Sequence, residues 1–252
     1  MPAVDQAAQL LFSLSTAPRG QATLTELCTQ VGIHKSKGLA ILNTLKASGL
    51  VARRDATKAY RLGPSLLSLS RALLDQADLT EATAPYLEPL AAATDSTVFL
   101  GLISRDEVVV AARHEAAAGG IGLNIRLGHR YPLTWGANGK AIVAFMPPEQ
   151  QDRVLSGERL YFYSKANARP TTRVRVEIAE CRRLGYSTDE SGVQTGINAV
   201  SAPVLSTRGE PIGVVTVVGT FSADSFPEYG GRVAAVTREM SLDLGALLEG
   251  AA

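Results

Sequence analysis

Apolar positions near the start of the chain recur every three or four residues, and this spacing predicts helices. Residues 4–15 carry apolar side chains at 7, 8, 10, 11, 12 and 14, and Ala17 to Gly20 breaks the pattern. A second helix is predicted between Thr23, which can act as its N-cap, and Gly32, which suits its end. Its apolar residues keep the helical spacing: Leu24, Leu27, Cys28 and Val31.

A third helix is predicted to begin near Lys35 and to end at Ser48-Gly49. Its buried stripe is expected to contain Gly38, Ile41, Leu42 and Leu45. Residues 50–54 and 58–62 then form two short strands around the turn 55–57. Three helices followed by a small hairpin predict a winged helix-turn-helix over residues 1–64, mainly α-helical, whose third helix enters the major groove of DNA.

The remainder of the chain mixes helical and strand patterns. Helices are predicted near 80–94, 136–146, 149–155, 173–184 and 228–248, and strands at 97–103, 107–113, 123–127, 198–205 and 213–220. Short polar turns join the first two and the last two strands, so these are expected to be antiparallel pairs. We therefore predict an α+β domain over 79–252, joined to the first domain by a leucine-rich linker helix at 65–78.

Length and composition limit the classes of protein that fit. With 252 residues and 46% hydrophobic residues, the chain suits a soluble protein of two domains. It lacks a run of about 18 apolar residues and a signal peptide, so we expect a cytoplasmic protein without a membrane partner. Cys28 and Cys181 are the only cysteines, which argues against a zinc site. We expect no metal and no cofactor.

Charge is divided unevenly between the two predicted domains. Residues 1–64 hold eight Lys or Arg and three acids, a net charge of +5, whereas the remainder holds 17 and 21, a net charge of −4. A basic domain beside an acidic one suits phosphate binding by one end alone. A merely solvated basic face is the alternative, and the helix-turn-helix pattern favours double-stranded operator DNA.

The outward positions of the third helix and the wing are the candidate DNA contacts. Lys35 and Lys37 can reach guanine or phosphate, and Asn43 an adenine edge. Gly38 reduces helix propensity by about 1 kcal/mol relative to Ala, so it either permits close packing or leaves the helix soft. Leu39 is expected to pack internally rather than meet a thymine methyl. The predicted set is Lys35, Ser36, Lys37, Ala40, Asn43, Thr44, Arg53, Arg54 and Lys58, with a simple solvated hairpin as the alternative for the last three.

Several segments together resemble the IclR family of bacterial transcriptional regulators. They are LTELCTQVGIHKSKGLAILNTLKASGLV at 24–51, YRLG at 60–63, LGHRYPLTWGANGKA at 127–141, LGYSTDESGVQTGINAVSAPV at 184–204 and GEPIGVVTVVG at 209–219. Each segment is weak alone, but their order and spacing are specific. The resemblance implies a GAF-like effector domain with an antiparallel sheet, which binds a small organic molecule, usually a carboxylate, and changes the DNA affinity of a dimer or dimer of dimers.

The resemblance also implies an effector pocket. Carried over by position, it contains Leu123, Ala137, Asn138, Asp189, Ile197, Ala199, Thr216 and Val218. Backbone N–H groups near Ala137 would favour an anion, and Asp189 would suit a hydroxyl or a protonated group. Trp135 either stacks on a ligand ring or belongs to the core.

The chain departs from the family pattern in both regions. Thr134 and Ala199 stand where the family commonly has His and Cys, which implies a less polar pocket. In the third helix the family's frequent Thr, Val, His and Arg become Lys37, Gly38, Leu39 and Ala40, so the operator sequence does not transfer.

An enzyme is the main alternative class. The GANGKA segment at 136–141 lacks the spacing and the Ser or Thr of a phosphate loop, and GGIG at 119–122 is no dinucleotide fingerprint. No G-x-S-x-G is present, and His34, His114 and His129 are dispersed. The second hypothesis is therefore a GAF-like small-molecule-binding or redox enzyme domain with an accessory interaction module. The third hypothesis is a protein-interaction module without DNA binding.

Overall fold

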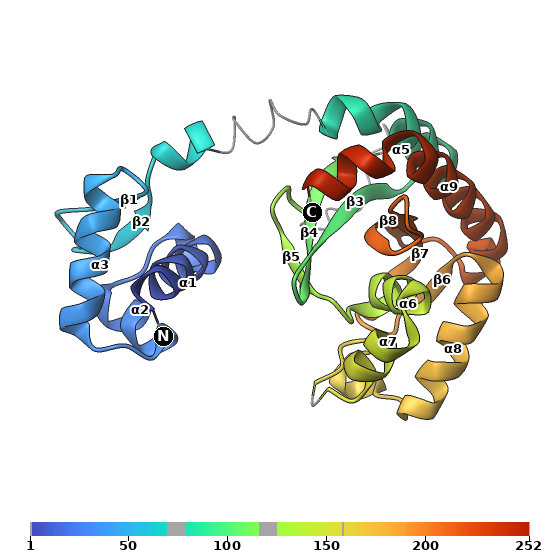
Figure 1. Ribbon diagram of the computed structural model, residues 1–252, viewed down its shortest axis with the longest axis horizontal. Helices are drawn as coiled ribbons and strands as arrows, with labels where there is room; N and C mark the ends of the chain where they lie inside the picture. The colour runs from blue at the N-terminus through green and yellow to red at the C-terminus, as the bar shows by residue number, and fades with distance from the viewer. Residues whose placement is uncertain (1, 70–78, 116–124, 158, 252) are drawn as a thin grey trace. The chain divides into compact units, whose positions relative to one another are not determined.

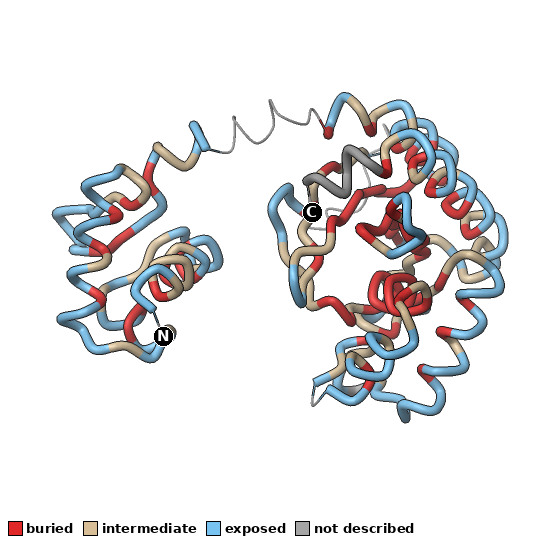
Figure 2. Tube along the Cα trace, in the orientation of Figure 1, coloured by how far each residue is buried: buried red, intermediate tan, exposed pale blue. Residues whose placement is uncertain are grey.

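The chain divides into two compact units, Met1–Gln76 and Ala77–Ala252 (Figure 1). The computed structural model describes residues 2–69, 79–115, 125–157 and 159–251. Each unit has its own buried apolar core, which is visible as separate buried stretches in Figure 2. Of the predicted linker helix, residues 65–69 are helical and 70–78 lie outside the described residues.

Residues 2–64 of unit 1 form three α-helices and a two-stranded hairpin. These are α1 (Ala3–Thr16), α2 (Leu24–Val31), α3 (Lys35–Ala47), β1 (Val51–Arg53) and β2 (Tyr60–Leu62), with a short 3-10 turn η1 (Pro18–Gly20) after α1. Thr23 and Glu26 cap α2 reciprocally, each side chain bonding the other's backbone N–H, so two unpaired donors at the helix start are satisfied. Leu10, Leu27 and Leu42, one from each helix, are fully buried in one core.

Gly38 lies where α3 crosses α2. A Cβ atom at this position would stand 2.3 Å from the Sγ of Cys28, so a larger residue would require the Cys28 side chain or the helices to shift. Of the two explanations offered by the sequence, close packing is therefore the one that the structure supports. Leu39 was expected to pack internally, and this prediction is wrong: its side chain is 39% exposed, because the buried stripe runs through Gly38, Leu42 and Leu45 instead.

Unit 2 is built on a six-stranded sheet in which every neighbouring pair is antiparallel. Its strand order is β5-β4-β3-β8-β7-β6. The strands are β3 (Thr97–Ser104), β4 (Glu107–His114), β5 (Arg130–Pro132), β6 (Ser187–Glu190), β7 (Asn198–Leu205) and β8 (Pro211–Gly219). The two predicted hairpins are confirmed as β3–β4 and β7–β8, which lie next to each other through β3 and β8.

Helices cover both faces of this sheet (Figure 1). They are α5 (Leu79–Thr94), α6 (Gly136–Phe145), α7 (Pro148–Leu155), α8 (Thr171–Leu184) and α9 (Phe226–Ala251), with 3-10 turns η2 (Lys165–Asn167) and η3 (Ala223–Ser225). α5 and α9 pack on the face that carries Val98, Val200 and Val217. α6 packs against α7 and α8 and reaches Val214 on the other face. The predicted α+β arrangement with an antiparallel sheet is confirmed for this unit.

The predicted strand at 123–127 is wrong for the residues that the structure describes. Residues 125–127 are not in a strand, and Gly128 adopts a positive φ of 77° in a turn closed by a bond from the His129 N–H to the Arg126 carbonyl. The strand at this edge of the sheet is β5, three residues further on. The edge strands β5 and β6 were both missed, because runs of three and four residues leave too short a pattern.

Candidate functional site

The outward side of α3 is polar and basic. Every predicted contact on this helix is exposed, namely Lys35, Ser36, Lys37, Ala40, Asn43 and Thr44. The buried positions Gly38, Leu42 and Leu45 hold the opposite side against the core. Two lysines in the first turn therefore project from a helix whose other face is fixed.

The hairpin after α3 carries the other predicted contacts. Arg53, Arg54 and Lys58 are exposed and lie at or beside the turn between β1 and β2. Arg53 stacks over the Tyr60 ring, with its guanidinium carbon 5.5 Å from the ring centroid. Tyr60 is itself bonded in both directions to the backbone of Ala22, so the hairpin is attached to the segment before α2. The structure thus brings all nine predicted residues onto the surface of unit 1.

A cavity of about 370 Å³ lies in unit 2 between the sheet and the start of α6. Trp135 lines this cavity, and so do seven of the eight pocket residues that the family resemblance implied. The seven are Ala137, Asn138, Asp189, Ile197, Ala199, Thr216 and Val218. Leu123, the eighth, lies outside the described residues. The volume is at the lower end of the roughly 300–1,000 Å³ of small-molecule sites.

Strand register explains why residues so distant in sequence meet here. Thr216 pairs with Phe99 on one side and with Ser201 on the other, and Val218 pairs with Ala199. Paired residues point to the same face of a sheet, and alternate residues along one strand do too. Phe99, Thr216, Val218 and Ala199 therefore share the face toward α6 and form the floor of the cavity.

Asn138 joins α6 to this floor. Its Oδ1 accepts hydrogen bonds from Thr216 Oγ1 at 2.6 Å and from Ser201 Oγ at 2.9 Å. Its side-chain NH₂ group makes no hydrogen bond to a described residue. Gly136, the first residue of α6, has a positive φ of 49° and passes close to Asp189 and Val193, where a Cβ would stand 3.5 and 3.0 Å from their side chains. The helix start can therefore lie directly against the cavity.

Asp189 is the only acidic residue among the described residues that line the cavity. Its side chain is buried, and Oδ2 accepts a hydrogen bond from the Val193 N–H at 3.2 Å. Oδ1 is buried without a hydrogen-bond partner. Burial raises the pKa of this carboxyl above its usual range, against the opposing effects of the Lys140 charge and the backbone N–H groups of Val193 and Gly192.

Aromatic rings that contact one another also line the cavity. The Tyr131 ring stacks on His129 with centroids 4.5 Å apart, on Phe99 at 6.1 Å, and lies tilted against Trp135 at 5.7 Å. All four side chains line the cavity. Trp135 is partly buried there, so its ring belongs to the wall. The site therefore has a polar end at Asn138 and Asp189 and an aromatic side.

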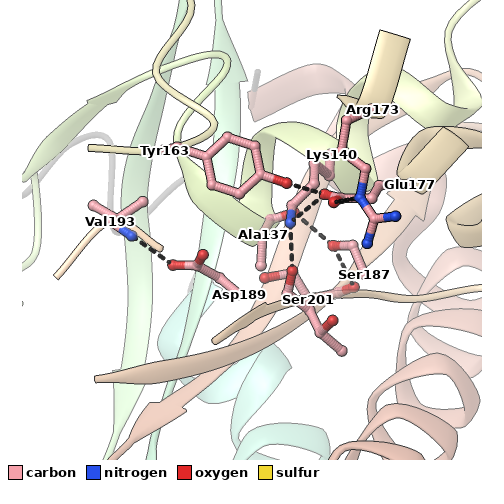
Figure 3. Close-up of polar contacts among 10 residues, drawn as sticks. Ala137, Lys140, Tyr163, Arg173, Glu177, Ser187, Asp189, Val193 and Ser201 are labelled. Carbon is pink, nitrogen blue, oxygen red and sulfur yellow. Dashed lines mark hydrogen bonds and ion pairs between the residues drawn. The ribbon is translucent and has the colours of Figure 1, made fainter. Parts of the chain in front are cut away.

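Lys140 lies behind the polar end and is the buried member of a charge cluster (Figure 3). Its Nζ contacts Glu177 Oε2 at 3.1 Å and donates to the Thr188 carbonyl at 2.6 Å. Tyr163 and Arg173 also donate to Glu177. Although burial disfavours its charge, these partners hold the pKa of the Glu177 carboxyl below its usual range. A larger groove of about 960 Å³ between α8 and β6 borders the same cluster.

Two sequence-based expectations about the cavity need correction or extension. Thr134 does not line it: its hydroxyl accepts a hydrogen bond from the Tyr161 N–H at 3.0 Å, so this residue says nothing about pocket polarity. Ala199 does line it. The sequence prediction missed further lining residues, including Phe99, His129, Tyr131, Val193 and Gln194. Phe99 could have been predicted from the pairing of its strand with the strand of Thr216, because paired residues share a sheet face.

The structure also bears on the enzyme alternative. Burial raises the pKa of the Cys181 thiol to about 12, which leaves little thiolate for redox chemistry at neutral pH. Within the described ranges, no group of three or more His, Cys, Asp or Glu side chains is placed to hold a metal ion. Among the described helices, none is both long and apolar enough to cross a membrane.

Residues 71–242 match the family model described as bacterial transcriptional regulator IclR C-terminal. The chain is 27% identical over 248 residues to the glycerol operon regulatory protein of Streptomyces coelicolor, covering 96% of each chain. It is 31% identical over 233 residues to the HTH-type transcriptional regulator Rv1719 of Mycobacterium tuberculosis, covering 90% of this chain and 84% of that protein.

Solved structures of IclR regulators share the fold of this chain. An IclR transcriptional regulator from Alicyclobacillus acidocaldarius superposes with a TM-score of 0.85 at 25% identity, covering 96% of this chain and 98% of that one. An IclR homolog from Microbacterium hydrocarbonoxydans, complexed with 4-hydroxybenzoate, has a TM-score of 0.73 at 17% identity, covering 96% and 99%. These relatives are transcriptional regulators rather than enzymes, and the resemblance found in the sequence is confirmed. The chain belongs to the IclR family of bacterial transcriptional regulators.

Proposed function

We propose that this protein represses or activates a metabolic operon by binding operator DNA through unit 1, and that a small organic effector in the unit 2 cavity changes its DNA affinity. Unit 1 is then a winged helix-turn-helix, with α3 in the major groove and the β1–β2 wing against the phosphates. Unit 2 is a GAF-like effector domain. The observation that carries the DNA half is the exposed basic face of α3 and the wing.

This face has the chemistry that DNA recognition requires. Lys35, Lys37, Arg53, Arg54 and Lys58 provide positive charge for phosphates, and Asn43 provides an amide that suits an adenine edge. Buried leucines fix α3 from behind, so its exposed side chains keep their spacing. In the wing, the stacking of Arg53 on Tyr60 orders one of these cations before DNA arrives.

The experiment begins with selection of bound duplexes from a random DNA pool by the full-length protein. Affinity for the selected duplex is then measured by fluorescence anisotropy at several salt concentrations. A logarithm of affinity that falls linearly with the logarithm of salt, steeply enough for several phosphate contacts, supports the proposal. Failure to enrich any duplex, or affinity that is insensitive to salt, contradicts it.

The effector half rests on the cavity and its lining. Polar groups gather at one end, where α6 begins, and aromatic rings form one side. A helix N-terminus favours an anion, so a small carboxylate, aromatic or aliphatic, is the proposed class of ligand. The related regulator bound to 4-hydroxybenzoate supports this class. A thermal-shift screen of small acids tests it: a ligand of the native state raises the unfolding midpoint, and absence of any such shift counts against an effector.

We further propose that the regulator works in the cytoplasm as a homo-oligomer, a dimer or dimer of dimers. Exposed apolar side chains on the described start of the linker helix, Leu67 at 74% and Leu69 at 59%, are consistent with a covered surface in an assembly. A dimer also doubles the number of basic helices on one operator. Light scattering coupled to size-exclusion chromatography gives the mass directly, and a monomer at micromolar concentration would contradict the assembly.

A further inference from the structure

α3 carries a large apolar side chain outside its buried stripe. Leu39 is 39% exposed, whereas the other leucines of this helix, Leu42 and Leu45, are buried. The close packing of Gly38 on Cys28 fixes this orientation, because successive residues of an α-helix are turned by about 100° and Leu39 directly follows Gly38. Leu39 therefore lies on the flank of the helix face that the proposed function directs at DNA.

The side chains around Leu39 suit a duplex better than a protein partner. Lys35 and Asn43 lie four residues before and after Leu39 on the same side of α3, and Ser36 lies three residues before it. All three are exposed. The sequence of α3, KSKGLAILNTLKA, contains three lysines and no acidic residue. A duplex pairs such lysines with phosphates, whereas an apolar protein surface laid over Leu39 would bury positive charge.

The major groove offers a leucine one kind of apolar group. Guanine presents two acceptors there, cytosine a donor, and adenine an acceptor and a donor, whereas thymine presents an acceptor and its 5-methyl group. The side chain of Leu39 has neither a donor nor an acceptor. Against the edges of the other three bases it would displace water without replacing the lost hydrogen bonds. Thymine is therefore the base whose edge matches this side chain.

We propose that Leu39 contacts the 5-methyl group of a thymine, so that α3 selects thymine at one position of the operator site bound by each chain. The inference rests on the proposed DNA binding by unit 1 and makes its sequence preference more specific. Residues four apart on a helix have Cβ atoms about 5–6 Å apart, and successive base pairs are about 3.4 Å apart, so this thymine lies within about two base pairs of the adenine assigned to Asn43.

Base analogues test the contact. In the duplex selected by the full-length protein, each thymine is replaced in turn by deoxyuridine, which lacks the methyl group but keeps every hydrogen-bonding atom. At one position the affinity, measured by fluorescence anisotropy, should fall about fourfold for each chain bound, because one methyl group is no longer buried. Replacement by 5-bromodeoxyuridine, whose bromine is close to a methyl group in size, should restore the affinity at that position.

Variants of the same helix assign the effect to Leu39. In Leu39→Ala the thymine and deoxyuridine duplexes should bind with nearly equal affinity, because the shortened side chain does not reach the methyl group. Leu39→Met keeps a long apolar side chain and should retain most of the preference. Lys37→Ala is the matched control: it should bind both duplexes more weakly, while the ratio of the two affinities keeps its wild-type value. Melting curves of all three variants verify the fold.

The outcomes separate this inference from the proposed function. Failure to enrich any duplex contradicts DNA binding itself. A selected duplex in which no deoxyuridine lowers the affinity, or a thymine preference that persists in Leu39→Ala, overturns the role of Leu39 and leaves DNA binding by unit 1 standing. The analogue series uses the wild-type protein, so it decides the question even if Leu39→Ala folds poorly.

Discussion

The face of α3 and the cavity of unit 2 are built in opposite ways. The α3 face and its wing take all their predicted contacts from residues 35–58, and these side chains are exposed. The cavity takes its lining from residues spread between 99 and 218, on strands, a helix start and loops. Contacts close together in sequence depend on one helix, whereas the cavity depends on the pairing register of a whole sheet. Changes in unit 2 should therefore spread further than changes on α3.

Loss of the buried charge at Lys140 is expected to have the largest effect. Lys140→Met deprives Glu177 of its main counter-charge and the Thr188 carbonyl of its donor, so unit 2 should lose about 3 kcal/mol of stability. Trp135, the only tryptophan, lies in this unit and reports its urea unfolding by fluorescence. The control Arg173→Gln removes a largely exposed partner of the same carboxylate and should change stability by less than about 1 kcal/mol. Equal effects of the two variants would show that Lys140 is not the buried member of the cluster.

The packing of α3 on α2 is the next test, because it asks how rigid the DNA-facing helix is. Gly38→Ala should destabilise unit 1 by about 1–3 kcal/mol through the clash with Cys28, although alanine favours helices more than glycine. The same change in a Cys28→Ala background should cost much less, since the clashing sulfur is gone. Hydrogen exchange of residues 24–47 measures the loss of stability in both backgrounds. Equal losses in the two backgrounds would contradict the close-packing explanation.

The Asp189 carboxylate, whose Oδ1 is buried without a hydrogen bond while Oδ2 is bonded to Val193, should make the cavity a weak point of its own unit. A native pKa above the unfolded value means that the native state binds the proton more tightly, so wild-type stability falls as pH rises through the interval between the two values. Asp189→Asn removes this dependence and should raise stability by about 1 kcal/mol at neutral pH. The gain should vanish below the usual Asp pKa of about 3.9. Urea titrations at both pH values check this, and a variant less stable than wild type at neutral pH would contradict it.

The smallest effect is expected on the exposed face itself. Lys37→Ala should weaken DNA binding by about fivefold and reduce the salt slope by about one for each chain bound, while the melting curve stays the same. Anisotropy titrations with the selected duplex give both quantities. Glu149→Ala, an exposed change in unit 2, is the control for nonspecific effects of lost charge. An unchanged affinity and slope for Lys37→Ala would contradict the placement of α3 in the groove.

Sequence alone predicted local structure well and spatial assembly less well. The capping of α2 at Thr23 and the buried stripe of α3 followed from spacing within single helices. The family resemblance named pocket residues that do meet around one cavity. It could not show that Thr134 turns away to the Tyr161 backbone, or that His129 and Tyr131 form an aromatic wall. Those facts depend on a turn and an edge strand whose pattern was too short to recognise. The burial of Asp189 Oδ1 without a hydrogen bond likewise depends on three-dimensional contacts.

The central claim is that occupancy of the cavity changes the DNA affinity of unit 1. The direct measurement is the affinity of the full-length protein for its selected duplex, with and without a ligand identified by the thermal-shift screen, in wild type and Asp189→Ala. We expect the ligand to change the wild-type affinity by about fivefold or more, the usual range of such coupling, and to leave Asp189→Ala unchanged while that variant still binds DNA. A ligand that binds the cavity without altering wild-type DNA affinity, or a response that persists in Asp189→Ala, would contradict the account.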